Sequence, residues 1–220
     1  DWGGGLFNTV SLLTEISSPE LINVAFYRNM APGGGGGIRN FGGSVDIKQA
    51  IFANNGAGLV EDGTSSGPGG GIHSSGNGTS LSVTNATFYR NWIVGVFIPQ
   101  FDGGAIFVEQ TSTLLNNVLI WGNEVEGDPA DPSASISIST LGGDVTVANS
   151  LVAHSGGSAN WNNAMGILDG GNNIDADPVF VSTIPGEVGY LQLSASSPAI
   201  NGGSNTAYTD AGGDLATDID

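Results

Sequence analysis

The chain has 220 residues without a cysteine, and its 21 acidic and four basic residues give it a formal net charge of −17. This charge excludes nucleic acids and anionic membrane surfaces as partners, and the lack of cysteine excludes disulfides and thiolate metal sites. No apolar run reaches the roughly 18 residues that a spanning helix needs, so we expect no membrane insertion by this segment.

A nine-residue phrase recurs along the chain. In its clearest copy, residues 83–91, it reads apolar-x-Asn-x-x-aromatic-x-x-Asn. The copies cover residues 21–29, 47–55, 83–91, 115–123 and 147–155. They are 26, 36, 32 and 32 residues apart, and self-similarity at such a period indicates a solenoid.

Glycine-rich runs add a second repeat with a constant spacing of 34 residues. They end in Ile38, Ile72 and Ile106. We expect these runs at corners where φ is positive or where strands approach closely. A phosphate-binding loop is the alternative, but strands and not helix N-termini are expected after the glycines.

Alternating apolar residues between the turns predict strands, because successive strand residues face opposite sides. These alternating pairs are Val45 and Ile47, Leu81 and Val83, Ile136 and Ile138, and Val145 and Val147. The 37 glycines disfavour helices, since each costs roughly 1 kcal/mol against alanine there. About three short strands per repeat predict an all-β protein, a parallel β-helix of six to seven coils. We expect residues 1–220 to form one domain, with regular repeats in 1–155 and irregular C-terminal coils and an acidic tail in 156–220.

The first amide of each phrase is predicted to lie at a corner between two strands. Stacked coils bring equivalent corners within about 4.8 Å, so these side chains can form a hydrogen-bonded amide ladder that satisfies internal polar groups. The predicted ladder consists of Asn23, Gln49, Asn85, Asn117 and Asn149. The aromatic position of the phrase is predicted to form a buried stack: Phe26, Phe52, Phe88, Ile120 and Val152.

The residue after each buried aromatic position should face outward. This column contains Tyr27, Tyr89 and Trp121, which we predict as a ligand-binding platform of the kind that accepts sugar rings. The alternative is a cross-strand aromatic pair that only stiffens the sheet.

Two sets of motifs carry a resemblance to known families. The glycine runs, together with the Phe-Tyr-Arg-Asn sequences at 26–29 and 88–91, resemble the GGAI and FxxN repeats of polymorphic outer-membrane protein passengers. Residues 173–181 (Asn-Ile-Asp-Ala-Asp-Pro-Val-Phe-Val), 190–193 and 197–203 resemble the end of secreted bacterial choice-of-anchor Q proteins.

Those relatives are right-handed parallel β-helices of the pectin-lyase-like class. The resemblance implies the same fold and handedness, an extracellular or cell-surface location in bacteria, and further chain after the acidic segment 210–220. It does not imply one function, because this class includes adhesins, lyases and hydrolases.

Acidic residues are the candidate metal ligands. Asp169, Asp175 and Asp177 lie close together in the sequence, and carboxylates with backbone carbonyls suit Ca²⁺. They match no defined calcium loop, so solvated turns are the alternative. We predict that the protein requires no cofactor, and that calcium is the one ion that these carboxylates could bind.

Few residues could support catalysis. Lyases of the class that the chain resembles use a basic proton acceptor near a carboxylate, and Arg39, Asp46 and Lys48 are the best trio for this role. His73 and His154 are expected in turns far apart in repeat position, which disfavours a catalytic pair.

We therefore predict a non-catalytic, secreted or cell-surface structural or adhesive module. Carbohydrate and other copies of the chain, joined end to end into filaments, are its predicted partners. The rival prediction is a polysaccharide lyase or glycoside hydrolase that acts on acidic polysaccharide.

Overall fold

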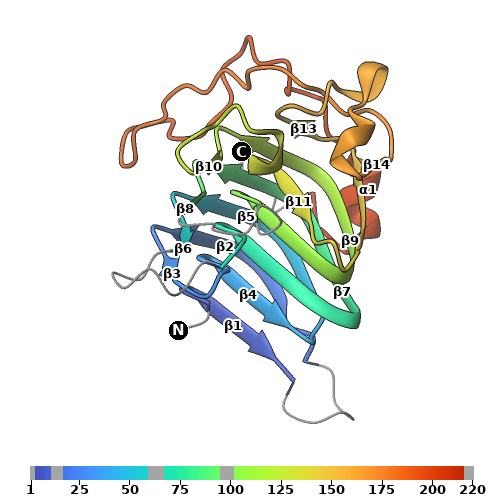
Figure 1. The fold of residues 1–220 in the computed structure, drawn as a ribbon. Coiled ribbons are helices and arrows are strands. Elements are labelled where there is room, and N and C mark those ends of the chain that lie inside the picture. Colours follow the sequence, from blue (N-terminus) through green and yellow to red (C-terminus); the bar gives the residue numbers. More distant parts are fainter. Residues whose placement is uncertain (1–2, 11–16, 59–66, 95–101, 216–220) are drawn as a thin grey trace.

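Parallel strands build the molecule. The computed structural model describes residues 3–10, 17–58, 67–94 and 102–215. Its strands stack into a β-solenoid of about four turns, which confirms the predicted parallel β-helix (Figure 1). The expected six to seven coils were too many, since each coil takes 26 to 36 residues and the strands that stack into coils end near residue 169.

The first side of the solenoid follows the glycine corner. It contains β1 (Leu6–Thr9), β4 (Ile38–Phe41), the beginning of β7 (Ile72–Tyr89), the beginning of β9 (Ile106–Trp121) and β11 (Ile136–Ile138). These strands pair in parallel and place Leu6, Ile38, Ile72, Ile106 and Ile136 in register. Equivalent positions of the repeat therefore lie above one another.

A longer second side follows after a turn. It contains β2 (Glu20–Tyr27), β5 (Val45–Ala53), the later parts of β7 and β9, β12 (Asp144–Ala148) and β13 (Leu151–Val152). β14 (Leu168–Asp169) pairs with β12. Each of the long strands bends where the first amide of the phrase adopts a left-handed φ between 52° and 55°. Asparagine tolerates this conformation better than most residues do.

A short third side closes each coil. β3 (Met30–Ala31), β6 (Gly56–Gly58), β8 (Trp92–Val94) and β10 (Glu124–Val125) form a separate parallel sheet. The chain then reaches the glycine corner, where Gly35, Gly69 and Gly103 have φ of 69°, 76° and 90°. Gly3 has φ of 69° at the equivalent place before Leu6, which makes it a further copy of this corner.

The core fills the interior of the coils. Ile47, Val83 and Leu115 are fully buried in register. The predicted aromatic stack is present, with ring centroids of Phe26 and Phe52 4.9 Å apart and those of Phe52 and Phe88 4.7 Å apart. Alternation along the strands thus directs these side chains inward, as predicted.

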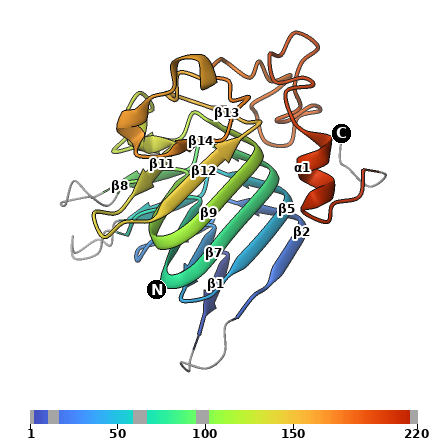
Figure 2. The ribbon, with the colours of Figure 1, turned by 90° about the vertical axis from the view of Figure 1, so that its right-hand side faces the viewer.

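The C-terminal part leaves the coil pattern. Short 3-10 helices (Pro132–Ala134, Ser158–Asn160 and Asn163–Met165) interrupt the strands, and Trp161, Met165 and Ile167 pack on the C-terminal end of the core. Residues 177–215, which we call the C-terminal strap, turn back along the outer face of the second side. The strap contains α1 (Asn205–Asp210), which packs beside β7 and β9 (Figure 2). No helix in the described ranges is of a length and hydrophobicity that would carry it across a membrane.

Candidate functional site

An amide ladder runs through the solenoid at the second asparagine of the phrase. Asn29, Asn55, Asn91 and Asn123 are linked by Nδ2–H···Oδ1 hydrogen bonds of 2.9 Å each. The Oδ1 atoms of Asn55, Asn91 and Asn123 also accept a hydrogen bond from the backbone N–H of the preceding asparagine, at 3.1, 3.1 and 2.9 Å respectively. These amides, of which Asn55, Asn91 and Asn123 are buried, connect successive coils and have little hydrogen-bonding capacity left for a ligand.

The predicted ladder lies six residues earlier, at the bend of the second side. Asn117 Nδ2 donates to Asn85 Oδ1 at 2.8 Å, so neighbouring coils do share this contact. Asn149 contacts Asn172 at 3.0 Å and Asn116 at 3.5 Å, and Asn23 is exposed. Gln49 is buried. The bond between Asn85 and Asn117 thus follows the prediction, whereas the longer ladder runs through the second asparagine of the phrase.

The strap covers the middle of the predicted aromatic platform, although Tyr27 at its end is 41% exposed. Tyr27, Tyr89 and Trp121 are in register on one face. Tyr89 is nevertheless only 5% exposed, because the ring of Phe180 packs edge-on against it at 5.4 Å. The ring of Tyr190 lies 6.1 Å from that of Tyr27. The platform therefore offers no continuous open surface to a sugar.

Lys48 is held in an ion-pair cluster. Its Nζ lies 2.5 Å from Glu20 Oε1 and 3.0 Å from Asp46 Oδ2, and its side chain is buried. The hydrogen bond to Glu20 raises the pKa of Lys48, and that to Asp46 adds to the effect. A lysine that keeps its proton is a poor general base. Arg39 of the predicted trio lies on β4, across the turn from β5, so the structure pairs Lys48 with Asp46 and places Arg39 elsewhere.

Arg39 lies beside His73 on the outer face of the first side. The two residues are in register, and both are buried. Burial lowers the pKa of Arg39 to about 10, although Glu109 opposes this shift. His73 lies in β7 and not in a turn, and its ring packs edge-on against Phe107 at 5.0 Å. Neither of its ring nitrogens has a hydrogen-bond partner among the described residues. Burial lowers the pKa of His73, and the positive charge of Arg39 lowers it further.

The three candidate calcium ligands each stabilise a turn. Asp169 accepts hydrogen bonds from Ser158 Oγ, Gly171 N and Asn173 Nδ2. Asp175 accepts hydrogen bonds from two backbone N–H groups, and Asp177 accepts one from the backbone N–H of Val179. Within the described residues no group of three or more His, Cys, Asp or Glu side chains is arranged to hold a metal. The calcium site thus stays a prediction without a defined ligand set.

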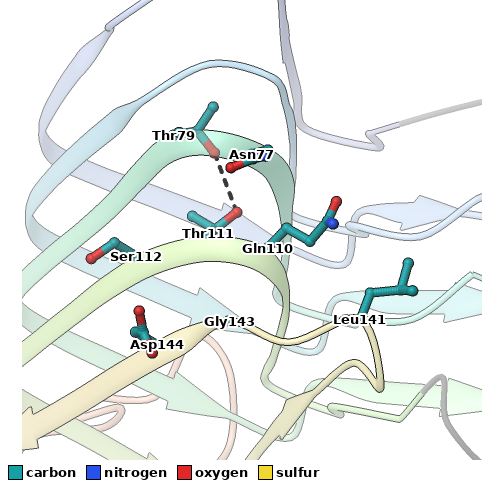
Figure 3. A pocket seen from close by; sticks show the side chains of 9 residues that line it. Asn77, Thr79, Gln110, Thr111, Ser112, Leu141, Gly143 and Asp144 are labelled. Atoms are coloured by element: carbon teal, nitrogen blue, oxygen red, sulfur yellow. Dashed lines mark hydrogen bonds between the residues drawn. The ribbon is translucent and has the colours of Figure 1, made fainter.

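A polar groove lies at the corner between the first and second sides. Its volume is about 360 Å³ (Figure 3). The described residues that line it come from three successive coils: Asn77, Gly78, Thr79, Gln110, Thr111, Ser112, Leu141, Gly143 and Asp144. No motif singled out in the sequence predicts this groove. Its signal is a 32-residue repeat of polar side chains, Thr79 with Thr111 and Ser112 with Asp144.

Comparison with known proteins identifies no relative of this chain. No family model matches the chain, and neither the curated proteins nor the solved structures give a significant match. The assignment of a parallel β-solenoid therefore rests on the strand pairing of this chain itself.

Proposed function

We propose that the chain is a non-catalytic structural or adhesive module whose stacked coils form a rigid scaffold. One observation carries this proposal: the groups best suited to chemistry already serve the fold. Lys48 is bound by two carboxylates, the central asparagines bond to one another, and Asp169 caps a turn. Side chains whose charges and hydrogen bonds are already paired within the protein stiffen the solenoid and are not available to act on a substrate.

A secreted or cell-surface location belongs to the same proposal. The resemblance to choice-of-anchor Q proteins and to polymorphic outer-membrane protein passengers supports it, as does the acidic composition, which keeps exposed sheet edges soluble. A right-handed coil of the pectin-lyase-like class is part of this proposal. Carbohydrate is the proposed partner of the adhesive surface.

Incubation with acidic polysaccharides tests the non-catalytic part. We expect neither the ultraviolet absorbance of unsaturated products nor new reducing ends with polygalacturonate or alginate, with or without calcium. Turnover that disappears in Lys48→Ala or Asp46→Asn, with the fold intact by circular dichroism, would establish the rival lyase or hydrolase. The matched control is Glu187→Gln, which removes an exposed carboxylate from the strap.

A further inference from the structure

We propose that the groove formed by 77–79, 110–112, Leu141 and Asp144 binds a neutral, hydroxyl-rich glycan. This inference rests on the proposed adhesive function and gives it a site and a ligand class. The groove lies at one corner of three successive coils, so the solenoid presents its lining in a regular series.

The floor of the groove is fixed by internal hydrogen bonds. Thr79 and Thr111 are buried, and their hydroxyl oxygens lie 3.3 Å apart (Figure 3). Thr79 Oγ1 donates to Gly76 O at 2.6 Å, and Thr111 Oγ1 donates to Glu109 O at 3.1 Å. The position of this floor is thus determined before any ligand arrives, which reduces the entropy lost on binding.

The rim carries side chains whose polar atoms are open to a ligand. Asn77, Gln110, Ser112 and Asp144 are exposed, and their side chains make no hydrogen bond within the described residues. Gln110 adopts a left-handed φ of 54°, and its N–H donates to Gly142 O at 2.6 Å. Its backbone is therefore anchored while its amide is available. These rim residues contrast with the asparagines of the ladder, which bond to one another.

The chemistry of the rim selects sugars. Amides and hydroxyls both donate and accept hydrogen bonds, as the hydroxyl groups of a glycan do. Leu141 is 64% exposed and projects from the coil next to Gln110 (Figure 3), where it can contact the apolar face of a sugar ring. Because coils repeat at about 4.8 Å, successive units of a linear glycan meet similar groups.

Charge excludes acidic glycans. Asp144 is the one charged residue among the described residues that line the groove, and the chain carries a net charge of −17. A polyuronate would be repelled by both. A neutral glycan needs no ion pair, so its affinity should depend little on salt.

Affinity electrophoresis in gels with soluble polysaccharides tests the ligand class. Dextran, galactomannan and xyloglucan represent neutral glycans, and polygalacturonate and alginate represent acidic ones. We expect retardation by at least one neutral glycan and none by the acidic ones. Raising NaCl from about 0.05 to about 0.5 M should change Kd less than about twofold. Retardation by no neutral glycan, or a preference for an acidic one, would overturn the proposal.

Substitution tests the site. The double variant Asn77→Ala/Gln110→Ala should raise Kd about tenfold or more, and Leu141→Ser should raise it about threefold. The matched control Asn160→Ala/Gln192→Ala removes exposed amides outside the groove and should leave Kd unchanged. Equal melting curves would show that the variants are folded. Unchanged binding by the groove variants would refute this site, whereas polysaccharide turnover would refute the proposed non-catalytic function instead.

Discussion

His73 shows how one buried side chain makes stability depend on pH. Burial favours the neutral imidazole, and the neighbouring Arg39 disfavours its protonation further, so the pKa of His73 is lowered in the folded state. The unfolded chain protonates this histidine near pH 6.5. Below that pH the unfolded state binds more protons than the folded state, so stability decreases as the pH falls.

We expect His73→Phe to remove this pH dependence and to stabilise the protein. Phenylalanine already occupies the register position of the next coil, Phe107. The substitution also eliminates two buried nitrogens that have no hydrogen-bond partner in the described parts of the chain. The expected gain is about 1 kcal/mol at neutral pH and more at pH 5. Urea denaturation from pH 5 to 8 measures it; an equally steep loss of stability in the variant would contradict this account.

Asn91 is the central residue of the amide ladder, and its loss should be costly. Its Oδ1 accepts two hydrogen bonds from Asn55, and its Nδ2 donates to Phe52 O and Asn123 Oδ1. Asn91→Ala leaves buried groups of two coils without partners, so we expect a loss of roughly 3 kcal/mol or more in unfolding free energy. Asn205→Ala, at an exposed position, should cost less than about 0.5 kcal/mol by the same measurement.

At the scale of elements, the C-terminal strap decides which face of the sheet is accessible. It contacts several coils. The ring of Phe180 packs against that of Tyr89, and Tyr190 Oη accepts a hydrogen bond from Asn54 Nδ2 at 3.4 Å. The backbone of Ser204 forms two hydrogen bonds with the Asn117 side chain: its N–H donates to Oδ1 at 2.7 Å, and its carbonyl oxygen accepts from Nδ2 at 2.9 Å. Because a coil in a solenoid otherwise contacts only its neighbours, the strap links coils that are apart along the axis.

We expect Phe180→Ala to loosen the strap and leave the coils intact. The substitution removes the ring that covers Tyr89, at a cost of about 1–2 kcal/mol. Hydrogen exchange should accelerate at the backbone amides of Val181 and Leu191, which are bonded within the strap. Amides of β7 should not change. The control Ile184→Ala removes a side chain that is 58% exposed, and an equal acceleration there would refute the role of Phe180.

At the scale of the whole molecule, the two ends of the solenoid differ. Trp161, Met165 and Ile167 pack on the core at the C-terminal end. At the other end, β1, β2 and β3 each pair on one side only within the described part of the chain. Phe26 and Val24 are only half-buried there. An unpaired strand edge is a template for association.

For this 220-residue chain we therefore expect a head-to-head dimer in place of the end-to-end filament predicted from the sequence, because Trp161, Met165 and Ile167 cover the C-terminal end of the core. We expect a concentration-dependent dimer in sedimentation velocity, weakened by Ile22→Lys, which places a charge on the exposed edge of β2. The control Val188→Lys changes a residue that is 96% exposed on the strap and should have no effect. Long polymers, or a dimer insensitive to Ile22→Lys, would contradict this prediction.

The parallel coils, the inward residues and the aromatic stack could all be predicted from the repeat pattern. Repeats at nearly constant spacing, with Ile38, Ile72 and Ile106 after glycine, require equivalent residues to stack, because an offset would expose the apolar face of every strand. The ladder was predicted only in part, since Asn85 and Asn91 both satisfy the pattern and the choice depends on which one lies inside the coil.

The strap, the groove and the environment of Lys48 could not be predicted, because they arise from contacts outside the repeat. The strap lacks the repeat, so no spacing shows that Phe180 returns to Tyr89. Lys48 meets Glu20 across 28 residues, and the groove joins side chains that are each ordinary turn residues in the sequence. Such contacts depend on where the chain turns back, and a local pattern carries information about neighbours in a repeat but none about segments that leave it.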